Sequence, residues 1–376
     1  MAIQQILDDA VAAGVAPGLV AMAITPAGET VSAAAGVRGA DNPVPMDLDT
    51  VFWIASLTKA VTSVAALQMV ERGLVTLDEP LGAKLPGLAA PRVLTGFDAD
   101  GKPVTAPATL PVTLRALLTH TAGFGYEFFS DELARYAAGR TTPSGWADEP
   151  DSPLLFEPGE RWQYGIGVDW AGRLVETLSG QTLDAYMAAN IFGPLGMTST
   201  SFFPDAALAA RKASVHQRQP DGGVAPIPFG MPPAPYFAMG GGGLYSTAGD
   251  YMKFLSAILS GGAGILNTQT VAMMGANHIG ELEAGVVKSS NANLTNDFEP
   301  MPGVDKRWGL GFLINQDPGP AGRSPGSLAW AGLANCYYWA DPKTGAAGVL
   351  MAQVLPFADP KVLQTFDAFE RAVYAS

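Results

Sequence analysis

The chain has 376 residues, 48% of them hydrophobic and 15% charged, a composition that fits a packed globular protein and excludes disorder as the main state. Its 22 Lys and Arg stand against 35 Asp and Glu, and a surface with a net charge of -13 repels phosphate backbones, so no nucleic-acid partner is expected. The single cysteine, Cys336, excludes an intrachain disulfide framework and any multi-cysteine metal site.

The N-terminal part of the chain bears on where the protein works. It reaches Asp8 and Asp9 without one basic residue, so the positively charged start of a secretory signal is missing. The longest mostly apolar stretch, Val11 to Ile24, is interrupted by Pro17 and is too short to cross a hydrocarbon core of about 30 Å as a helix. We therefore expect a cytoplasmic protein with no membrane partner.

The beginning of the chain predicts a helix, a hairpin and a second helix. Ile3 to Ala13 has the amphipathic pattern of a helix. β-Branched and small residues in Gly18 to Thr25 and in Glu29 to Val37 flank a Pro-Ala-Gly turn, which indicates a β-hairpin. Leu57 to Arg72 carries apolar residues on nearly every face, so we expect a helix buried inside the protein.

Short helical patterns dominate the middle of the chain, and short strands its last part. The helical patterns are separated by Gly- and Pro-rich loops and lie at Leu114 to Thr119, Val168 to Leu178, Leu183 to Ile191 and Asp250 to Leu259. Apolar runs bounded by turn signals then indicate antiparallel strands at Trp308 to Ile314, Ser327 to Ala331, Asn335 to Ala340 and Gly348 to Leu355. A final helical pattern, Val362 to Tyr374, closes the chain.

Strands at both ends and helices between them predict an α+β fold of the α/β sandwich type. One antiparallel sheet would be formed by both chain ends and flanked by helices. Residues 1–75 and 305–376 would make a discontinuous α/β domain, and residues 76–304 a mainly helical inserted lobe. The active site is expected between the two.

A serine and a lysine stand three residues apart at the start of the predicted buried helix. This spacing places the side chains of Ser56 and Lys59 on one face of its first turn. Burial lowers the pKa of a lysine, so Lys59 could accept the proton of the Ser56 hydroxyl, and the N–H groups at the helix start favour a developing negative charge. A helix-capping serine followed by a surface lysine would give the same pattern.

Two further sequence elements would belong to the same site if the fold brings them close to Ser56 and Lys59. Tyr164 follows a Pro-Gly turn and could share or relay the serine proton. Trp330 to Gly332 lies on a predicted strand, where the small residues allow a substrate carbonyl to approach the backbone. Core packing alone would also explain either element.

The three elements, in this order, resemble the serine hydrolases related to class C β-lactamases and penicillin-binding proteins, and most closely the family VIII carboxylesterases. The resemblance covers almost the whole chain and includes residues 117–124, 240–250 and 340–342. It implies a β-lactamase-like fold, with Ser56 as the acylated nucleophile and Lys59 and Tyr164 as bases. It also implies an oxyanion hole formed by the backbone N–H groups of Ser56 and Leu333, and neither cofactor nor metal.

Two departures from the β-lactamase pattern bear on the substrate. Tyr-x-Asn is replaced by Tyr164-Gly165-Ile166, and the Lys-Thr-Gly strand by Trp330-Ala331-Gly332, so the cation that would pair with a lactam carboxylate is absent. A literal Lys-Thr-Gly at 343–345 follows an Asp-Pro turn and indicates a hairpin. The substrate-binding candidates are Trp330, Gly332, Phe124, Tyr126 and Ile166, and other aromatic residues that could line the pocket are Phe128, Phe129, Trp146, Tyr236 and Phe237.

Two other kinds of site can be weighed against this one. Gly322 to Gly326 matches the Gly-x-Ser-x-Gly pattern of α/β-hydrolases, but Pro325 has no N–H for an oxyanion and no histidine follows, so we interpret it as a turn. The three histidines, His120, His216 and His278, have no metal-ligand spacing. His120 is expected to support the loop near the site.

The sequence thus predicts a cofactor-independent serine carboxylesterase that hydrolyses short-chain or apolar carboxylic esters through an acyl-enzyme at Ser56. Its partner would be a small-molecule ester. An acyltransferase, an amidase, a D-amino-acid peptidase or a weak β-lactamase on the same scaffold is an alternative. A penicillin-binding or sensory protein without turnover is an alternative of another class, and the oligomeric state is not indicated.

Overall fold

A computed structural model describes residues 3–139, 152–231 and 237–376. Its main feature is an eight-stranded sheet in the order β10-β11-β12-β13-β14-β1-β2-β3, with antiparallel neighbours throughout. The strands are β1 (Gly18–Ile24), β2 (Thr30–Gly39), β3 (Asn42–Pro45), β10 (Lys306–Trp308), β11 (Leu313–Asn315), β12 (Leu328–Gly332), β13 (Cys336–Ala340) and β14 (Ala347–Met351). The two ends of the chain meet where β1 pairs with β14, which confirms the predicted antiparallel sheet.

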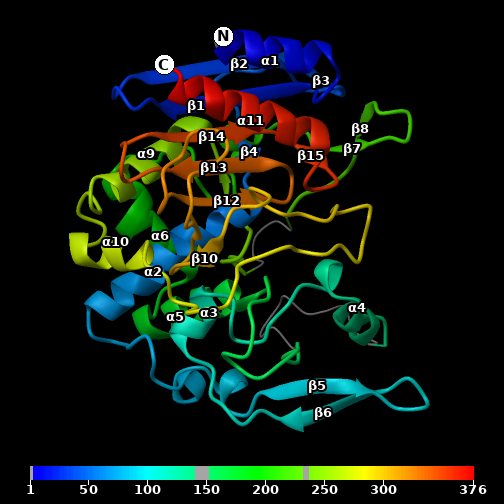
Figure 1. The fold of residues 1–376 in the computed structure, drawn as a ribbon, viewed down its shortest axis with the longest axis vertical. Helices are drawn as coiled ribbons and strands as arrows, with labels where there is room; N and C mark the ends of the chain where they lie inside the picture. The colour runs from blue at the N-terminus through cyan, green and yellow to red at the C-terminus, as the bar shows by residue number, and fades with distance from the viewer. Residues whose placement is uncertain (1–2, 140–151, 232–236) are drawn as a thin grey trace.

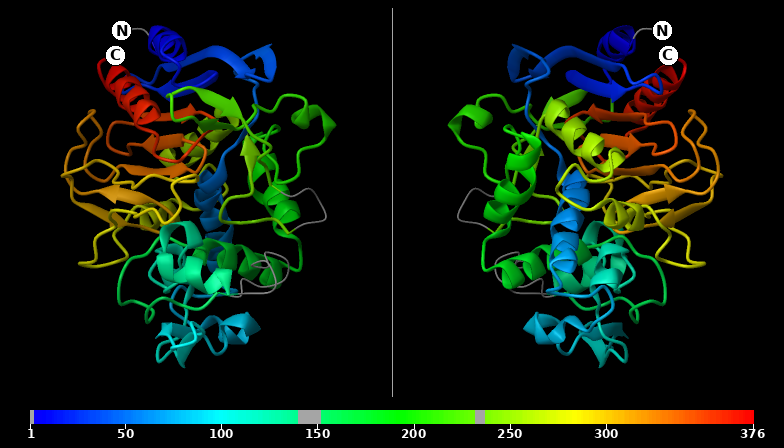
Figure 2. Two further views of the ribbon diagram at one scale, coloured as in Figure 1. Left: turned by 90° about the vertical axis from the view of Figure 1, so that its right-hand side faces the viewer. Right: turned by 90° about the vertical axis from the view of Figure 1, so that its left-hand side faces the viewer.

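Helices cover both faces of this sheet. On one face α1 (Ile3–Ala12) and α11 (Pro360–Tyr374) lie side by side, at the upper front of Figure 1. The other face packs against α9 (Ala248–Leu259), with α2 (Thr58–Glu71) beyond it. Figure 2 shows α2 running between the sheet and the helices of the middle region, where apolar residues on every face find neighbours.

Two threonines of α2 hydrogen-bond to a glycine-rich segment, which explains their presence in a buried helix. Thr62 donates its hydroxyl to Gly240 O at 2.7 Å. Thr58 Oγ1 accepts a hydrogen bond from the N–H of Leu244 at 3.1 Å. Because buried polar groups need partners, these bonds fix residues 240–244 against the first turns of the helix.

The middle of the chain is helical, with strand pairs that the sequence did not indicate. Its helices are α3 (Leu114–Leu118), α4 (Asp131–Ala138), α5 (Gly167–Ser179), α6 (Leu183–Met187), α7 (Gly193–Leu195), α8 (Ala206–Ala209) and α10 (Thr268–Met274), with short helical turns at Ala55–Leu57, Leu81–Ala83, Pro86–Leu88, Glu127–Phe129 and Ala188–Phe192. The unexpected strands are β4 (Phe52–Trp53) with β9 (Tyr245–Ser246), β5 (Arg92–Phe97) with β6 (Pro103–Pro107), and β7 (His216–Arg218) with β8 (Val224–Pro226). The predicted strand from Gly348 to Leu355 divides into β14 and β15 (Val354–Leu355), and β15 pairs with β7. The division into two domains stays a prediction.

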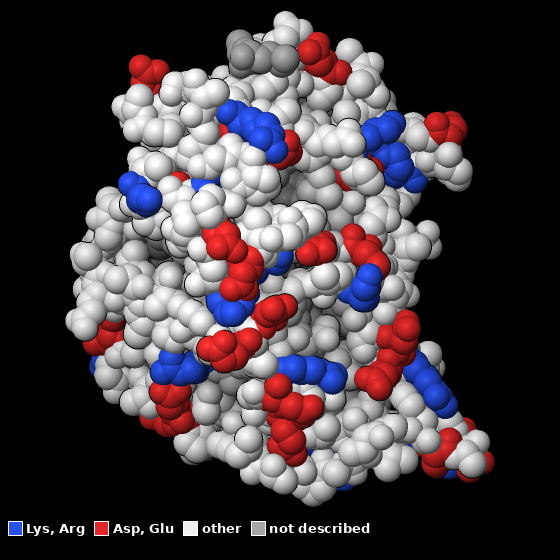
Figure 3. Space-filling view, viewed as in Figure 1, with Lys and Arg blue, Asp and Glu red and all other residues white. Residues whose placement is uncertain are grey.

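Charged side chains are interspersed on the face drawn in Figure 3. Acidic and basic residues alternate there, without a continuous basic area on that face. Among the described residues, no helix combines the length and the apolar character that crossing a membrane requires.

Candidate active site

Lys59 points inward and contacts Ser56. Its Nζ lies 3.2 Å from Ser56 Oγ, and it donates to the hydroxyl of Tyr126 at 2.8 Å and to Gly241 O at 2.6 Å. The residue is 1% exposed. When uncharged, the amine can keep its two N–H bonds on Tyr126 and Gly241 while its lone pair accepts the Ser56 proton.

Burial sets the protonation of this lysine. It lowers the pKa of Lys59 well below its ordinary value, and the carboxylate of Asp169 on α5 opposes that shift. Asp169 does not touch the amine directly. Its Oδ1 accepts the N–H of Gly241 at 2.8 Å, so the two side chains meet opposite ends of residue 241. A side chain at Gly241 would place a Cβ 2.3 Å from Asp169 Oδ2, so only glycine fits there.

Tyr164 lies over the lysine and bonds to Trp330. Its ring centroid is 4.8 Å from Lys59 Nζ, and its hydroxyl accepts the indole N–H of Trp330 at 2.9 Å. Burial raises the pKa of Tyr164 far above its ordinary value, although hydrogen bonds with Ser56 and Trp330 oppose the shift. A phenol that stays protonated fits the relay of a proton better than a permanently ionised base.

His120 supports the segment that carries Tyr164. Its Nδ1 accepts the N–H of Gly165 at 3.4 Å, and its carbonyl accepts the N–H of Gln163 at 2.9 Å. Burial, and then the charge of Lys59, lower the pKa of His120 well below its ordinary value, so the ring is neutral. This arrangement agrees with the supporting role expected from the sequence.

The two expected oxyanion donors lie on adjoining turns. Leu333 directly follows β12, and Gly332 presses against the turn that carries Ser56, because a Cβ there would lie 2.4 Å from Ile54 O. Ser56 and Leu333 line one cavity, and within the described residues neither backbone N–H has an acceptor. The small size of Gly332 therefore lets the strand approach the backbone of Ile54, whereas the sequence suggested that it made room for a substrate carbonyl.

Asn335 fixes the turn after β12. It is fully buried, with a left-handed backbone (φ 62°), and its Nδ2 donates to Val354 O at 2.7 Å and to Pro356 O at 2.8 Å. Its Oδ1 accepts the N–H of Asp359 at 3.1 Å and the hydroxyl of Tyr337 at 2.6 Å. A side chain with all these bonds holds Leu333, two residues earlier, in one position.

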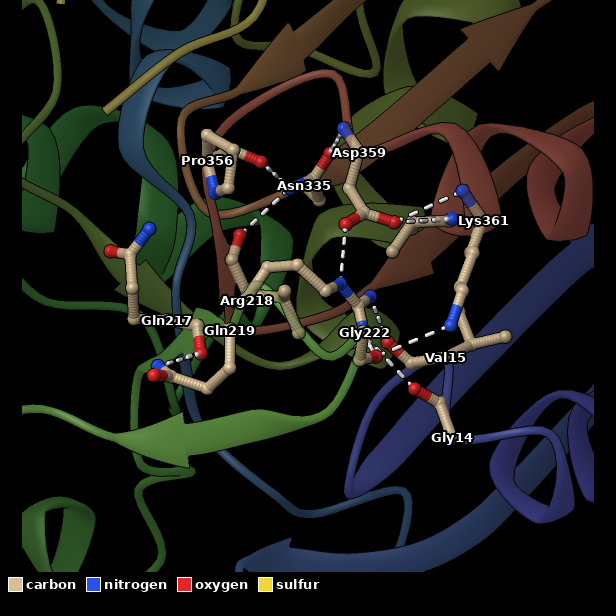
Figure 4. A network of polar contacts seen from close by, with 12 residues as sticks. Gly14, Val15, Gln217, Arg218, Gln219, Gly222, Asn335, Pro356, Asp359 and Lys361 are labelled. Atoms are coloured by element: carbon tan, nitrogen blue, oxygen red, sulfur yellow. Dashed lines mark hydrogen bonds and ion pairs between the residues drawn. The ribbon is translucent and has the colours of Figure 1, made fainter. Parts of the chain in front are cut away.

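Arg218 extends this network to three more segments, as Figure 4 shows. Its Nε donates to Asp359 Oδ2 at 2.8 Å, and the other nitrogens donate to the carbonyls of Gly14, Val15 and Gly222. The turn that carries Leu333 is thus tied through Asp359 to the start of α11, the entry to β1 and the β7–β8 hairpin. Nothing local in the sequence indicated this connection.

An apolar cavity of about 280 Å³ opens above Ser56. Tyr126, Tyr164 and Trp330 line it together with the oxyanion turns, and none of the described residues in its lining is charged. The remaining wall residues are Trp53, Ala55, Phe128, Phe129, Phe229, Met231, Met239, Gly241, Gly242, Val287, Leu294, Phe298, Ala331 and Phe357. The wall comes from many separate segments, which is why most of it was not predicted.

Several of the predicted substrate contacts lie elsewhere. Phe124 is buried and stacks on Trp170 at 6.2 Å between ring centroids, and neither it nor Ile166 nor Gly332 lines the cavity. Phe237 lies against Arg173. Trp146 and Tyr236 are outside the described residues. Tyr126 does line the cavity, and its bond to Lys59 gives it a second position in the site that the sequence did not reveal.

The competing sequence patterns form turns. Ser324 lies between β11 and β12, where its N–H donates to Asp341 Oδ2 at 2.9 Å, and it does not line the cavity. Residues 343–345 connect β13 and β14, and Asp341 accepts the N–H groups of Lys343 and Thr344. Among the described residues, no group of three His, Cys, Asp or Glu could hold a metal ion.

Comparisons with known proteins agree with this fold. The Beta-lactamase family model matches residues 3–371. Lovastatin esterase of Penicillium rubens is 34% identical over 88% of this chain and 86% of its own length. Monacolin J acid methylbutanoyltransferase of Aspergillus terreus is 36% identical over 88% of this chain and 83% of its own. The structure of Simvastatin Synthase (LovD) from Aspergillus terreus superposes with a TM-score of 0.87 at 32% identity, covering 99% of this chain and 97% of that one.

The fold and the relatives together define an enzyme of the serine hydrolase and acyltransferase type. The chain belongs to the β-lactamase family. This confirms the superfamily expected from the sequence, whereas the finer assignment to the family VIII esterases stays a prediction.

Proposed function

We propose that the protein is a serine carboxylesterase for short-chain or apolar carboxylic esters, with Ser56 as nucleophile. The observation that carries the proposal is the contact between Ser56 and a buried lysine whose pKa is lowered, at the floor of a cavity that no charged residue lines within the described part of the chain. Such a lysine is uncharged more readily than one in water, and only the uncharged amine accepts a proton.

Acylation follows from the positions of these groups. The Ser56 hydroxyl gives its proton to Lys59 Nζ as Oγ bonds to the ester carbonyl carbon, and the carbonyl oxygen becomes an oxyanion facing the N–H groups of Ser56 and Leu333. The carbon–alkoxy bond then breaks. The leaving alkoxide takes the proton from Lys59 through the hydroxyl of Tyr164, which gives one proton and receives another.

Deacylation reverses the roles. A water molecule gives a proton to Lys59 as its oxygen attacks the acyl carbon, and Ser56 Oγ leaves and recovers a proton from the ammonium. The carboxylic acid departs, and the enzyme returns to its starting state. The described residues of the cavity offer aromatic and aliphatic side chains and no lining cation to pair with a substrate carboxylate, which favours neutral, apolar esters.

An acyltransferase is the second candidate, because two of the relatives compared above are named as a methylbutanoyltransferase and a synthase. The chemistry is the same up to the acyl-enzyme, and an alcohol then replaces water. A neutral apolar cavity suits a hydrophobic alcohol acceptor as well as a hydrophobic ester.

Turnover of a chromogenic butyrate ester tests the proposal. Steady hydrolysis is expected, and Ser56→Ala should abolish it, whereas Ser324→Ala should hydrolyse the ester at the wild-type rate. A single burst equal to the enzyme concentration would indicate a penicillin-binding or sensory protein instead. With a hydrophobic alcohol added, transfer appears as ester product formed at the expense of the free acid.

The remaining expectations need other measurements. A panel of amides, D-amino-acid peptides and a chromogenic lactam separates the amidase, peptidase and lactamase alternatives. The cytoplasmic location also stays a prediction.

A further inference from the structure

A second cavity adjoins the catalytic one. It measures about 250 Å³ and lies between the sheet and α11, where its lining includes Leu313, Ala329, Tyr337, Leu363 and Phe366. Of the described residues, three line both cavities and therefore form the wall between them: Phe298, Trp330 and Ala331.

Phe298 supplies the part of this wall that can be removed without touching the catalytic groups. Trp330 donates to the hydroxyl of Tyr164. Ala331 has no side chain beyond Cβ. Phe298 is 5% exposed, and its ring meets those of Trp330 at 6.2 Å and Phe357 at 4.8 Å.

The backbone holds Phe298 in place. Its N–H and carbonyl pair with those of Val287, at 2.9 Å and 2.8 Å. From Phe298 the chain continues over the second cavity, since residues 299–302 also line it. The ring therefore stands at a fixed point where one cavity ends and the next begins.

We propose that Phe298 ends the substrate pocket and sets its limit for chain length, and that the cavity behind it is a subsite for the far end of a longer apolar chain once the ring is removed. The inference deepens the proposed function and rests on it. The charged residues that line the second cavity do not point to a charged ligand, because each is already paired: Arg323 with Glu370, Asp367 with Arg371, and Glu299 with Lys306. The apolar residues near the wall fit methylene groups.

Hydrolysis rates for esters of increasing acyl chain length test whether Phe298 limits the length of the substrate. Aryl esters of acetate, butyrate, octanoate and laurate are compared for wild type and Phe298→Ala. The ratio of kcat/KM for laurate to that for butyrate should rise about tenfold or more in the variant, as the burial of one or two further methylene groups would give. Turnover of the butyrate ester reports that the variant is folded.

Phe357→Ala is the matched control. Phe357 contacts Phe298 and lines the catalytic cavity but not the second one, so its removal creates the same amount of space without joining the cavities. The laurate to butyrate ratio should change less than in Phe298→Ala. An equal rise in both variants would overturn the proposal, because added room alone would then explain the effect.

A further experiment fills the second cavity again with a larger side chain. Leu363 lies on α11 and lines only that cavity, so Leu363→Trp in the Phe298→Ala background should restore the wild-type ratio. Leu363→Trp alone should leave butyrate turnover unchanged. A ratio that stays high in the double variant would contradict the inference.

A binding measurement separates failure of the inference from failure of the proposed function. Calorimetric affinities of methyl butyrate and methyl laurate are measured for Ser56→Ala with and without Phe298→Ala. The preference for laurate should rise with Phe298→Ala even if the enzyme proves not to hydrolyse esters. An unchanged preference would overturn the subsite whatever the activity.

Discussion

Two buried basic side chains, Arg323 and Lys59, are held in opposite ways. The guanidinium of Arg323 forms a two-pronged ion pair with Glu370 on α11, with Nε 2.7 Å from Oε1 and a second contact between Nη2 and Oε2, and each side chain is 4% exposed. Burial alone would lower the pKa of Arg323, but the Glu370 carboxylate raises it.

Lys59 has no carboxylate in contact among residues 3–139, 152–231 and 237–376. Its three partners are the oxygens of Ser56, Tyr126 and Gly241, and the charge of Asp169 acts on it from the far side of residue 241. The pKa of Lys59 is accordingly lowered. A buried cation with a bound carboxylate keeps its charge and holds structure together, whereas one among neutral oxygens is free to exchange a proton.

Among the variants that test this contrast, Lys59→Met should produce the largest change in activity. Loss of the proton acceptor is expected to reduce kcat for a butyrate ester by about 10³-fold. Stability should not fall, because a buried ammonium is removed. In the wild type, stability should rise with pH between the lowered pKa of Lys59 and its ordinary value of 10.5, since the unfolded chain binds more protons there, and the variant should lose that rise. Urea unfolding at several pH values measures both curves.

Lys306→Met is the control for that variant. Lys306 is also buried, but its Nζ donates to the carbonyls of Met301 and Val304, away from Ser56. This variant should lose stability and keep kcat per folded molecule. A loss of turnover like that of Lys59→Met would remove the contrast between the two lysines.

Glu370→Gln should have the opposite effect, a loss of stability without a loss of activity. Removing one charge of a buried pair leaves Arg323 uncompensated, so the free energy of unfolding should fall by about 3 kcal/mol, while kcat of the folded fraction stays near wild type. Asp367→Asn on the same helix, which breaks a solvent-exposed pair with Arg371, should have a much smaller effect. Equal losses in the two variants would mean that burial does not decide the value of these pairs.

Asp169→Asn should give the smallest effect, a shift of the pH profile. The amide oxygen can still accept the N–H of Gly241, but the charge that favours the ammonium of Lys59 is gone. The pKa of Lys59 should fall further, and the acidic limb of kcat/KM should move to lower pH. The other groups facing Lys59 are Tyr126, Tyr164 and His120, and Arg173 faces Asp169.

The control for this shift is Asp250→Asn. Asp250 is a buried carboxylate on α9 that accepts the N–H of Ser199 and is paired with Lys253, outside the catalytic cavity. Its replacement should leave the acidic limb in place. An unmoved limb in Asp169→Asn would show that Asp169 acts on Lys59 only by holding residue 241.

Single residues show how much of the site and of the fold could be predicted from the sequence. Ser56 and Lys59 are one helical turn apart, so local geometry predicted their contact. Only tertiary structure brings Tyr126 into contact with Lys59 and places the charge of Asp169 near it, and no spacing pattern marks either residue. The strands β5 and β6 were missed because the register shift at Gly96 and the prolines at the ends of β6 give the pattern of a loop.

The sheet built from both ends of the chain also constrains how the enzyme is made. Strand β1 leaves the ribosome long before β14, which covers its open edge. Until then the nascent chain exposes an unpaired strand edge, the usual starting point for aggregation. Leu333 follows β12 and is likewise synthesised long after Ser56, so the serine waits without one of its two proposed oxyanion donors until that strand has been made.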